Sequence, residues 1–193
     1  MSVATPGQVL DFWFDEPGGA EHGRARGLWF TKSAATDASI RERFGTSVEA
    51  GLRGELDGWV SAGRLDALAL ILLLDQFTRN IFRDTPQAFA GDARALQVAT
   101  ALVDGGTDRG LSLHQRWFAY LPFEHAESLP MQDRSVALFE GLARDGLTEP
   151  LDWAVRHRDV IAQFGRFPHR NAILGRSSTA EELAFLAQPG SRF

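Results

Sequence analysis

One short segment, residues 74–83, gathers several side chains that could do chemistry, and it reads LDQFTRNIFR. At about 100° of rotation per helical residue, its polar side chains share one arc and its apolar side chains share the opposite arc. A carboxylate, amides and guanidinium groups on one face could bind a carboxylate or a phosphate, because the planar arginine fork matches both. The polar residues of this arc are Asp75, Gln76, Arg79, Asn80 and Arg83.

The simpler interpretation of this arc is a solvated helix face with an Asp75–Arg79 pair at i,i+4, worth a few tenths of a kcal/mol. One turn earlier, however, Leu72 and Leu73 fall on the same side of the helix. Because an apolar residue such as Leu72 is expected to pack against other elements, Asp75 on the same helix face is expected to be partly buried as well. The pattern therefore favours a partly buried polar network.

A second group lies at residues 153–176, where five arginines face one acid in a chain of net charge −5. His157 shares a helical arc with apolar residues, where a histidine is more often part of the core than a ligand. An irregular stretch, RFPHRN, follows Gly165 and carries Arg166, His169, Arg170 and Asn171. This basic segment predicts either an anion site or internal pairs with acids such as Asp75, Asp92, Glu124 or Glu127.

A third group is YLPFEHAE at residues 120–127, which contributes His125 and Glu127. With His157 and His169, these residues could form an acid–base or a metal site. No HExxH spacing is present, so no metal is assigned. The GxSxG, GxGxxG and GxxxxGK[ST] patterns are also absent, and the cofactor stays unidentified.

The elements that must position these groups are helices throughout. Capping patterns begin at Thr5, Ser112 and Ser178 or Thr179, and helices are expected at about 65–82, 130–145 and 149–164. The helix at 65–82 is apolar nearly all round in its first half, which predicts a buried central element. Short links predict antiparallel helical hairpins in a single all-α domain, residues 1–193.

Composition narrows the function classes. Acids outnumber bases, 25 to 20, which argues against a nucleic-acid partner, and the absence of cysteine excludes disulfides and thiol chemistry. The longest strongly apolar run, residues 67–74, is too short to cross a membrane, and the N-terminus does not resemble a signal peptide, so we expect a cytoplasmic protein. All but one of the 20 bases are arginine, which a GC-rich genome alone would produce.

The segments at 74–83, 88–92 (AFAGD), 120–127 and 157–176 together resemble a bacterial family catalogued as domain of unknown function 924. Thr78 stands where proline is equally common in that pattern. The resemblance covers nearly the whole chain and implies a tetratricopeptide-like helical fold. It implies no established activity.

Two hypotheses follow. The first is a site between helices for a small anionic ligand, with enzymatic chemistry left open. The groups expected to hold the ligand are Arg79, Asn80, Arg83, Arg166, Arg170 and Asn171. Asp75 and Glu127 would orient them, and a histidine would transfer a proton because histidine titrates near neutrality. The histidine candidates are His125, His157 and His169.

The second hypothesis is a tetratricopeptide-like scaffold that binds a peptide or protein in an exposed groove, with the arginine and histidine groups as a structural network. Such a groove would be lined by Trp29, Phe30, Trp59 or Trp117. The first hypothesis is favoured, because a peptide groove does not need histidine and asparagine in an arginine-rich irregular loop. The likeness to scaffold proteins is one of fold alone.

Overall fold

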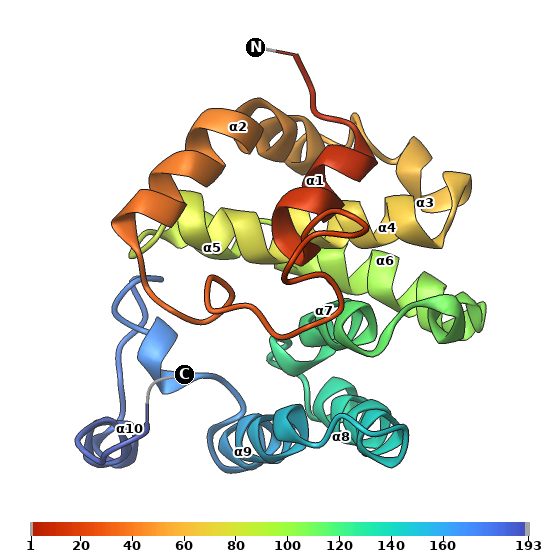
Figure 1. Cartoon of the computed structure of the whole chain (residues 1–193). Coiled ribbons are helices and arrows are strands. Elements are labelled where there is room, and N and C mark those ends of the chain that lie inside the picture. The colour runs from red at the N-terminus through yellow and green to blue at the C-terminus, as the bar shows by residue number, and fades with distance from the viewer. Residues whose placement is uncertain (1, 192–193) are drawn as a thin grey trace.

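The computed structural model describes residues 2–191, and over this range the chain folds into helices with no strand, which confirms the all-α prediction (Figure 1). The α-helices are α1 (Pro6–Phe14), α2 (Ala34–Leu52), α3 (Gly58–Ala62), α4 (Arg64–Ile71), α5 (Thr78–Ile81), α6 (Asp92–Asp104), α7 (Leu113–Glu124), α8 (Leu129–Arg144), α9 (Glu149–Phe164) and α10 (Ala180–Leu186). A π-helical turn, Leu72–Phe77, joins α4 to α5, and 3₁₀ turns form at Pro86–Phe89, Thr107–Gly110 and Pro168–Arg170.

Three helices begin at the capping boxes that the sequence predicts. The side chains of Thr5, Ser112 and Thr179 accept hydrogen bonds from the backbone N–H three residues later, at the starts of α1, α7 and α10. In each case the glutamine or glutamate at that later position bonds back to the backbone of the cap. These reciprocal bonds satisfy N–H groups that have no partner inside the helix.

The predicted central helix runs from α4 through the π turn to α5 and is surrounded by α1, α2, α6 and α7. Every residue from Leu68 to Asp75 is fully buried. The sequence predicts a regular helix here, whereas the structure has a π turn, in which the wider winding displaces the backbone. The hydroxyl of Thr78 donates to the Leu74 carbonyl at 2.8 Å, inside this wider turn.

The start of α6 lies directly against the π turn, at a position that only glycine can fill. A Cβ added to Gly91 would lie 2.2 Å from the carbonyl oxygen of Leu74 and 2.9 Å from its Cα. The missing side chain allows the two backbones to approach. This approach places Asp92, the first residue of α6, beside Arg79 of α5.

The second half of the chain forms helical hairpins. In it α8 packs against both α7 and α9 across the short connections 125–128 and 145–148 (Figure 1). The connection between α1 and α2 runs across to α7, where the rings of Trp29 and Phe118 are 4.9 Å apart. Phe167 is fully buried and anchors the irregular stretch after α9. Over the described range, no helix combines the length and apolar character needed to cross a bilayer.

Candidate functional site

A cavity of about 430 Å³ opens between the central helix, α7, α9 and the turn at Pro168–Arg170. Its volume is in the usual range for small-molecule sites. Polar side chains from four segments distant in the sequence meet there, and aromatic side chains complete the lining. The lining residues are Phe30, Gln76, Arg79, Trp117, Leu121, Glu124, His125, Trp153, His157 and Arg170.

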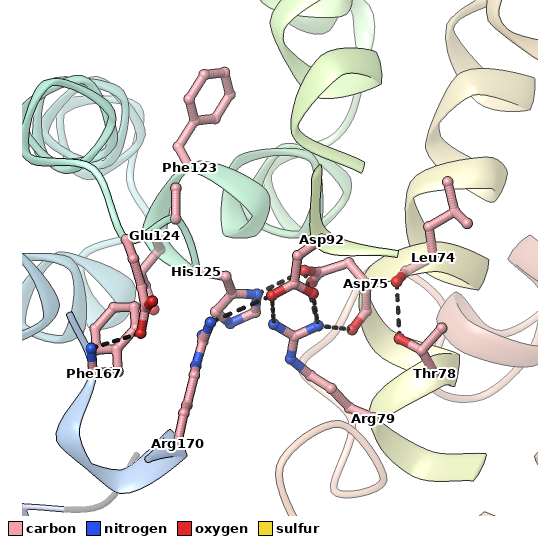
Figure 2. A network of polar contacts seen from close by, with 12 residues as sticks. Leu74, Asp75, Thr78, Arg79, Asp92, Phe123, Glu124, His125, Phe167 and Arg170 are labelled. Carbon is pink, nitrogen blue, oxygen red and sulfur yellow. Dashed lines mark hydrogen bonds and ion pairs between the residues drawn. The ribbon is translucent and has the colours of Figure 1, made fainter. Parts of the chain in front are cut away.

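An aspartate–histidine pair forms behind this cavity. Asp75, in the π turn, is fully buried, and its Oδ1 lies 2.7 Å from Nδ1 of His125, the residue that follows α7 (Figure 2). Gln76 donates to the other carboxylate oxygen at 2.6 Å, and Arg79 lies 3.2 Å from Oδ1. Burial opposes ionisation of Asp75, but Arg79 and His125 outweigh it and hold its pKa below the ordinary value.

The ionised carboxylate fixes the state of the imidazole. Burial lowers the pKa of His125, and the charge of Asp75 only partly opposes that effect. His125 is therefore neutral near pH 7, with its proton on Nδ1, from which it donates to Asp75. Nε2 remains as the acceptor nitrogen of a histidine that lines the cavity.

Two arginines share the carboxylate of Asp92 on the other side of Asp75 (Figure 2). Arg79 donates to both Asp92 oxygens, at 2.8 and 3.0 Å, and to the Asp75 carbonyl at 2.6 Å. Arg170 reaches Asp92 only at 3.4 Å. The bidentate pair is therefore between Arg79 and Asp92, and Arg170 is the weaker partner.

Arg170 is a buried cation with few polar partners. Its side chain is 8% exposed, its guanidinium carbon lies 4.8 Å from the ring centroid of Phe89 and 4.5 Å from that of Phe167, and its Nε has no hydrogen-bond partner. Burial lowers its pKa to about 10, and the nearby charge of Arg79 adds to this effect. Because burial disfavours the charge of this guanidinium, an anion that enters the cavity would stabilise it.

Glu124 faces the same cavity as a neutral acid. It is 4% exposed, its Oε2 has no hydrogen-bond partner, and burial together with the charge of Asp75 raises its pKa to about 8. Its Oε1 lies 3.4 Å from Nδ1 of His157, which donates to the Trp153 carbonyl at 2.8 Å. Burial lowers the pKa of His157 to about 3, so both groups are uncharged near pH 7.

Five residues predicted from the sequence meet in or directly behind the cavity. Asp75, Arg79, His125, His157 and Arg170 come from the central helix, the end of α7, α9 and the turn that follows it. The prediction of a partly buried polar network also matches the full burial of Asp75.

The remaining predicted residues lie outside the cavity lining and make contacts elsewhere. Asn80 and Arg83 both bind Asp37 on α2, at 2.8 Å. The polar arc of the central helix is wide enough to face α6 with one edge and α2 with the other. These two side chains are on the α2 edge, which explains why the cavity does not include them.

The loop after α9 pairs mostly with nearby acids. Arg166 binds Glu182 at 2.6 and 2.9 Å, and Asn171 donates to the same carboxylate at 3.1 Å. Glu127 accepts from Arg176 at 2.6 Å and from the Phe167 N–H at 2.8 Å. These contacts hold the loop in place, which makes Glu127 a structural support for the turn that carries Arg170.

His169 is next to Arg170 in the 3₁₀ turn but does not line the cavity. Burial lowers its pKa to about 4, with a further contribution from Arg170, so it is neutral near pH 7. Among residues 2–191, no cluster of three or more histidines and carboxylates is arranged to hold a metal ion.

Glu124 is a site residue that the sequence indicates only as a possible arginine partner. The available signal was a single glutamate within the otherwise apolar run YLPFE. The sequence does not indicate Leu121, Trp153 or, as parts of this site, Phe30 and Trp117. Phe30 is in the connection between α1 and α2, where no periodicity indicates which surface it faces.

Glu124→Gln is expected to remove the decline of stability that Glu124 causes between pH 4.5 and about 8. The pKa of Glu124 is raised from 4.5 to about 8, so the folded chain holds one proton more than the unfolded chain between those values. This contribution to stability is complete below pH 4.5 and is lost as the pH rises through 8. Glutamine does not ionise, so the variant should lack a slope of up to about 1.4 kcal/mol per pH unit.

Urea denaturation from pH 5 to 8 measures this slope. Glu55→Gln is the matched control, because Glu55 pairs with Arg53 at the exposed surface, and it should leave the slope unchanged. Equal slopes in Glu124→Gln and the wild type would show that Glu124 is already ionised in the folded protein.

The chain matches the family model described as "Bacterial protein of unknown function (DUF924)" over residues 9–190. It is also similar to the solved structure of a protein of unknown function from Agrobacterium tumefaciens. The two share 41% sequence identity, the match covers 94% of this chain and 96% of that one, and the TM-score is 0.83. No curated protein matches the chain.

Proposed function

This chain belongs to the bacterial DUF924 family, and we propose that its cavity binds a small anionic molecule within reach of a proton-transfer group, His125. The observation that carries the proposal is Arg170. It is a nearly buried guanidinium on the cavity wall with one long ion pair and an Nε that has no hydrogen-bond partner. A carboxylate or phosphate oxygen in the cavity would give this guanidinium a closer partner than Asp92, which it reaches only at 3.4 Å.

The charges around the cavity are compatible with a bound anion. Arg79 and Arg170 are balanced by Asp75 and Asp92, so the site carries no formal charge when Glu124 is protonated. A protonated Glu124 does not repel an anion and can donate its proton in a hydrogen bond. Arg79 is already held by both carboxylates, so the anion would interact mainly with the weakly paired Arg170.

His125 is the residue suited to proton transfer. Its Nδ1–H is held by Asp75, so Nε2 can accept a proton from a bound molecule and return it later. Asp75 acts here as a positioning residue, because it fixes the tautomer and stabilises the charge that develops on the ring. Glu124 is a neutral acid on the same wall and can serve as the complementary donor.

Thermal denaturation with a panel of anions tests the proposal. Acetate, succinate, phenylacetate and inorganic phosphate are suitable probes, since a ligand at about 100 times its Kd adds about 2.7 kcal/mol of stability. At least one should stabilise the wild type, and Arg170→Gln should abolish that shift. Arg166→Gln is the matched control: it removes an arginine of the same loop that binds Glu182 outside the cavity, so the shift should persist.

The proposal fails if no probe stabilises the wild type, or if both variants lose the shift equally. In the latter case the anion would be responding to the general charge of the loop rather than to Arg170. A shift that persists in Arg170→Gln would likewise place the anion elsewhere on the molecule.

The alternative is a tetratricopeptide-like scaffold that binds a peptide or protein in an aromatic groove. Trp29 and Trp117 are only 7% and 9% exposed and belong to the core, and Trp59 packs against that core. Phe30 is exposed, but it lines the cavity described above. The burial of these tryptophans removes most of the surface that a peptide groove would need, and it favours a small ligand.

A further inference from the structure

Two large aromatic side chains remain exposed at this cavity although they come from different parts of the chain. Phe30, in the connection between α1 and α2, is 62% exposed, and Trp153, on α9, is 46% exposed. Both line the cavity, together with the mostly buried Trp117. Phe30 packs against Trp117 at 5.0 Å between ring centroids. Apolar surface left open around a pocket is typical of a ligand site.

The lining changes from aromatic to polar along two helices. On α7, Trp117, Leu121 and Glu124 are four and three residues apart, so they share one face over about 10 Å. On α9, Trp153 and His157 are one turn apart on one face. In both helices the aromatic residue comes first and the polar residue second. A ligand that matches both walls has an apolar ring at one end and a polar group at the other.

The polar end favours a single negative charge over two. The two arginines already face two carboxylates, Asp75 and Asp92, and their charges cancel. A monoanion can bind to Arg170 and accept a hydrogen bond from protonated Glu124. A dianion would leave the site with one more negative charge beside the buried Asp75, at a cost that grows in a low-dielectric setting.

We infer that the ligand class of this site is an aromatic monocarboxylate, with its carboxylate at Arg170 and Glu124 and its ring against Phe30, Trp117 and Trp153. This inference rests on the proposed function, to which it adds the identity of both ends of the ligand. The ring end gains from stacking and edge contacts with three aromatic side chains. The carboxylate end gains from a charge-assisted hydrogen bond in a partly dry site.

Calorimetric titration of the wild type with phenylacetate, acetate and phenyl phosphate tests the two ends separately. Phenylacetate should bind about tenfold or more tightly than acetate, from the added ring contacts. It should also bind more tightly than phenyl phosphate, which carries the same ring on a dianionic group. Trp153→Ala and Phe30→Ala should each weaken phenylacetate binding severalfold and leave acetate binding unchanged.

Val155→Ala is the matched control, because Val155 is an exposed apolar residue of α9 that does not line the cavity. Both aromatic variants alter exposed side chains, and circular dichroism verifies that they remain folded. Equal affinity for phenylacetate and acetate, or no effect of either aromatic variant, would overturn the ring assignment. Tighter binding of phenyl phosphate would overturn the monocarboxylate assignment.

These outcomes are distinct from a failure of the proposed function. If acetate or inorganic phosphate binds and Arg170→Gln abolishes that binding, the anion site stands even when the aromatic preference is absent. If no anion binds at all, both the site and its ligand class are rejected.

Discussion

Gly91→Ala is expected to lower the free energy of unfolding by roughly 3 kcal/mol, at the upper end of what overpacking costs. The added Cβ would lie 2.2 Å from the Leu74 carbonyl oxygen, and the atoms it meets are backbone atoms that cannot rotate away. The φ of Gly91 is −90°, which alanine adopts freely, so the whole effect is steric. Relief requires α6 to move away from the π turn, which would also draw Asp92 away from Arg79.

Urea denaturation measures the loss, and Gly45→Ala provides the control. Gly45 is inside α2, where an added Cβ meets no atom within 4 Å. That variant should be more stable than the wild type by about 0.5–1 kcal/mol, because alanine is the better helix former. If Gly91→Ala were as stable as the wild type, the close approach of α6 to the central helix would not exist in solution.

Asp75→Asn is expected to cost about 3 kcal/mol, in the range seen when one partner of a buried ion pair is removed. The substitution keeps the shape of the side chain but leaves Arg79 with Asp92 as its remaining carboxylate partner. It also replaces the charged acceptor of the His125 Nδ1–H with a neutral amide, which holds the proton on Nδ1 less strongly. Stability and the chemistry of the histidine should therefore change together.

Two measurements separate these effects. Urea denaturation gives the loss of stability, and Asp133→Asn is the control, because Asp133 pairs with Arg158 at the exposed surface and should change it little. Nitrogen NMR of the His125 ring gives the tautomer, which should shift from protonated Nδ1 in the wild type toward a mixture. An unchanged tautomer in Asp75→Asn would contradict the role of Asp75 as a positioning residue.

Helix identity and helix starts follow from local chemistry, which is why the sequence predicts them well. The capping boxes at Thr5, Ser112 and Thr179 are each complete within four residues. The buried polar face of the central helix could also be predicted, because Leu72 and Asp75 share one side. These inferences need no knowledge of distant parts of the chain.

The division of that polar face could not be predicted. Arg79 and Arg83 are one turn apart and look equivalent on a helical wheel, yet one binds Asp92 and the other Asp37. The choice depends on where α2 and α6 begin in space. In the same way, the excess of arginine after residue 153 does not reveal that Arg166 meets Glu182 while Arg170 stays poorly paired.

The π turn in the central helix has a consequence for how insertions and deletions would act on this chain. Such a turn is an α-helix that has taken up one additional residue, so the rotational phase of α5 is offset from that of α4. Loss of one of its apolar residues, Leu72, Leu73, Leu74 or Phe77, would convert the turn to a regular α-helix and keep every charged group of the site in the chain. Because the turn already holds one residue more than a regular helix, α5 would keep its orientation relative to α4. The same loss from a regular helix would turn the side chains that follow it by about 100°. The pairing of Arg79 with Asp92 therefore tolerates a change of length in this turn that a regular helix would not tolerate.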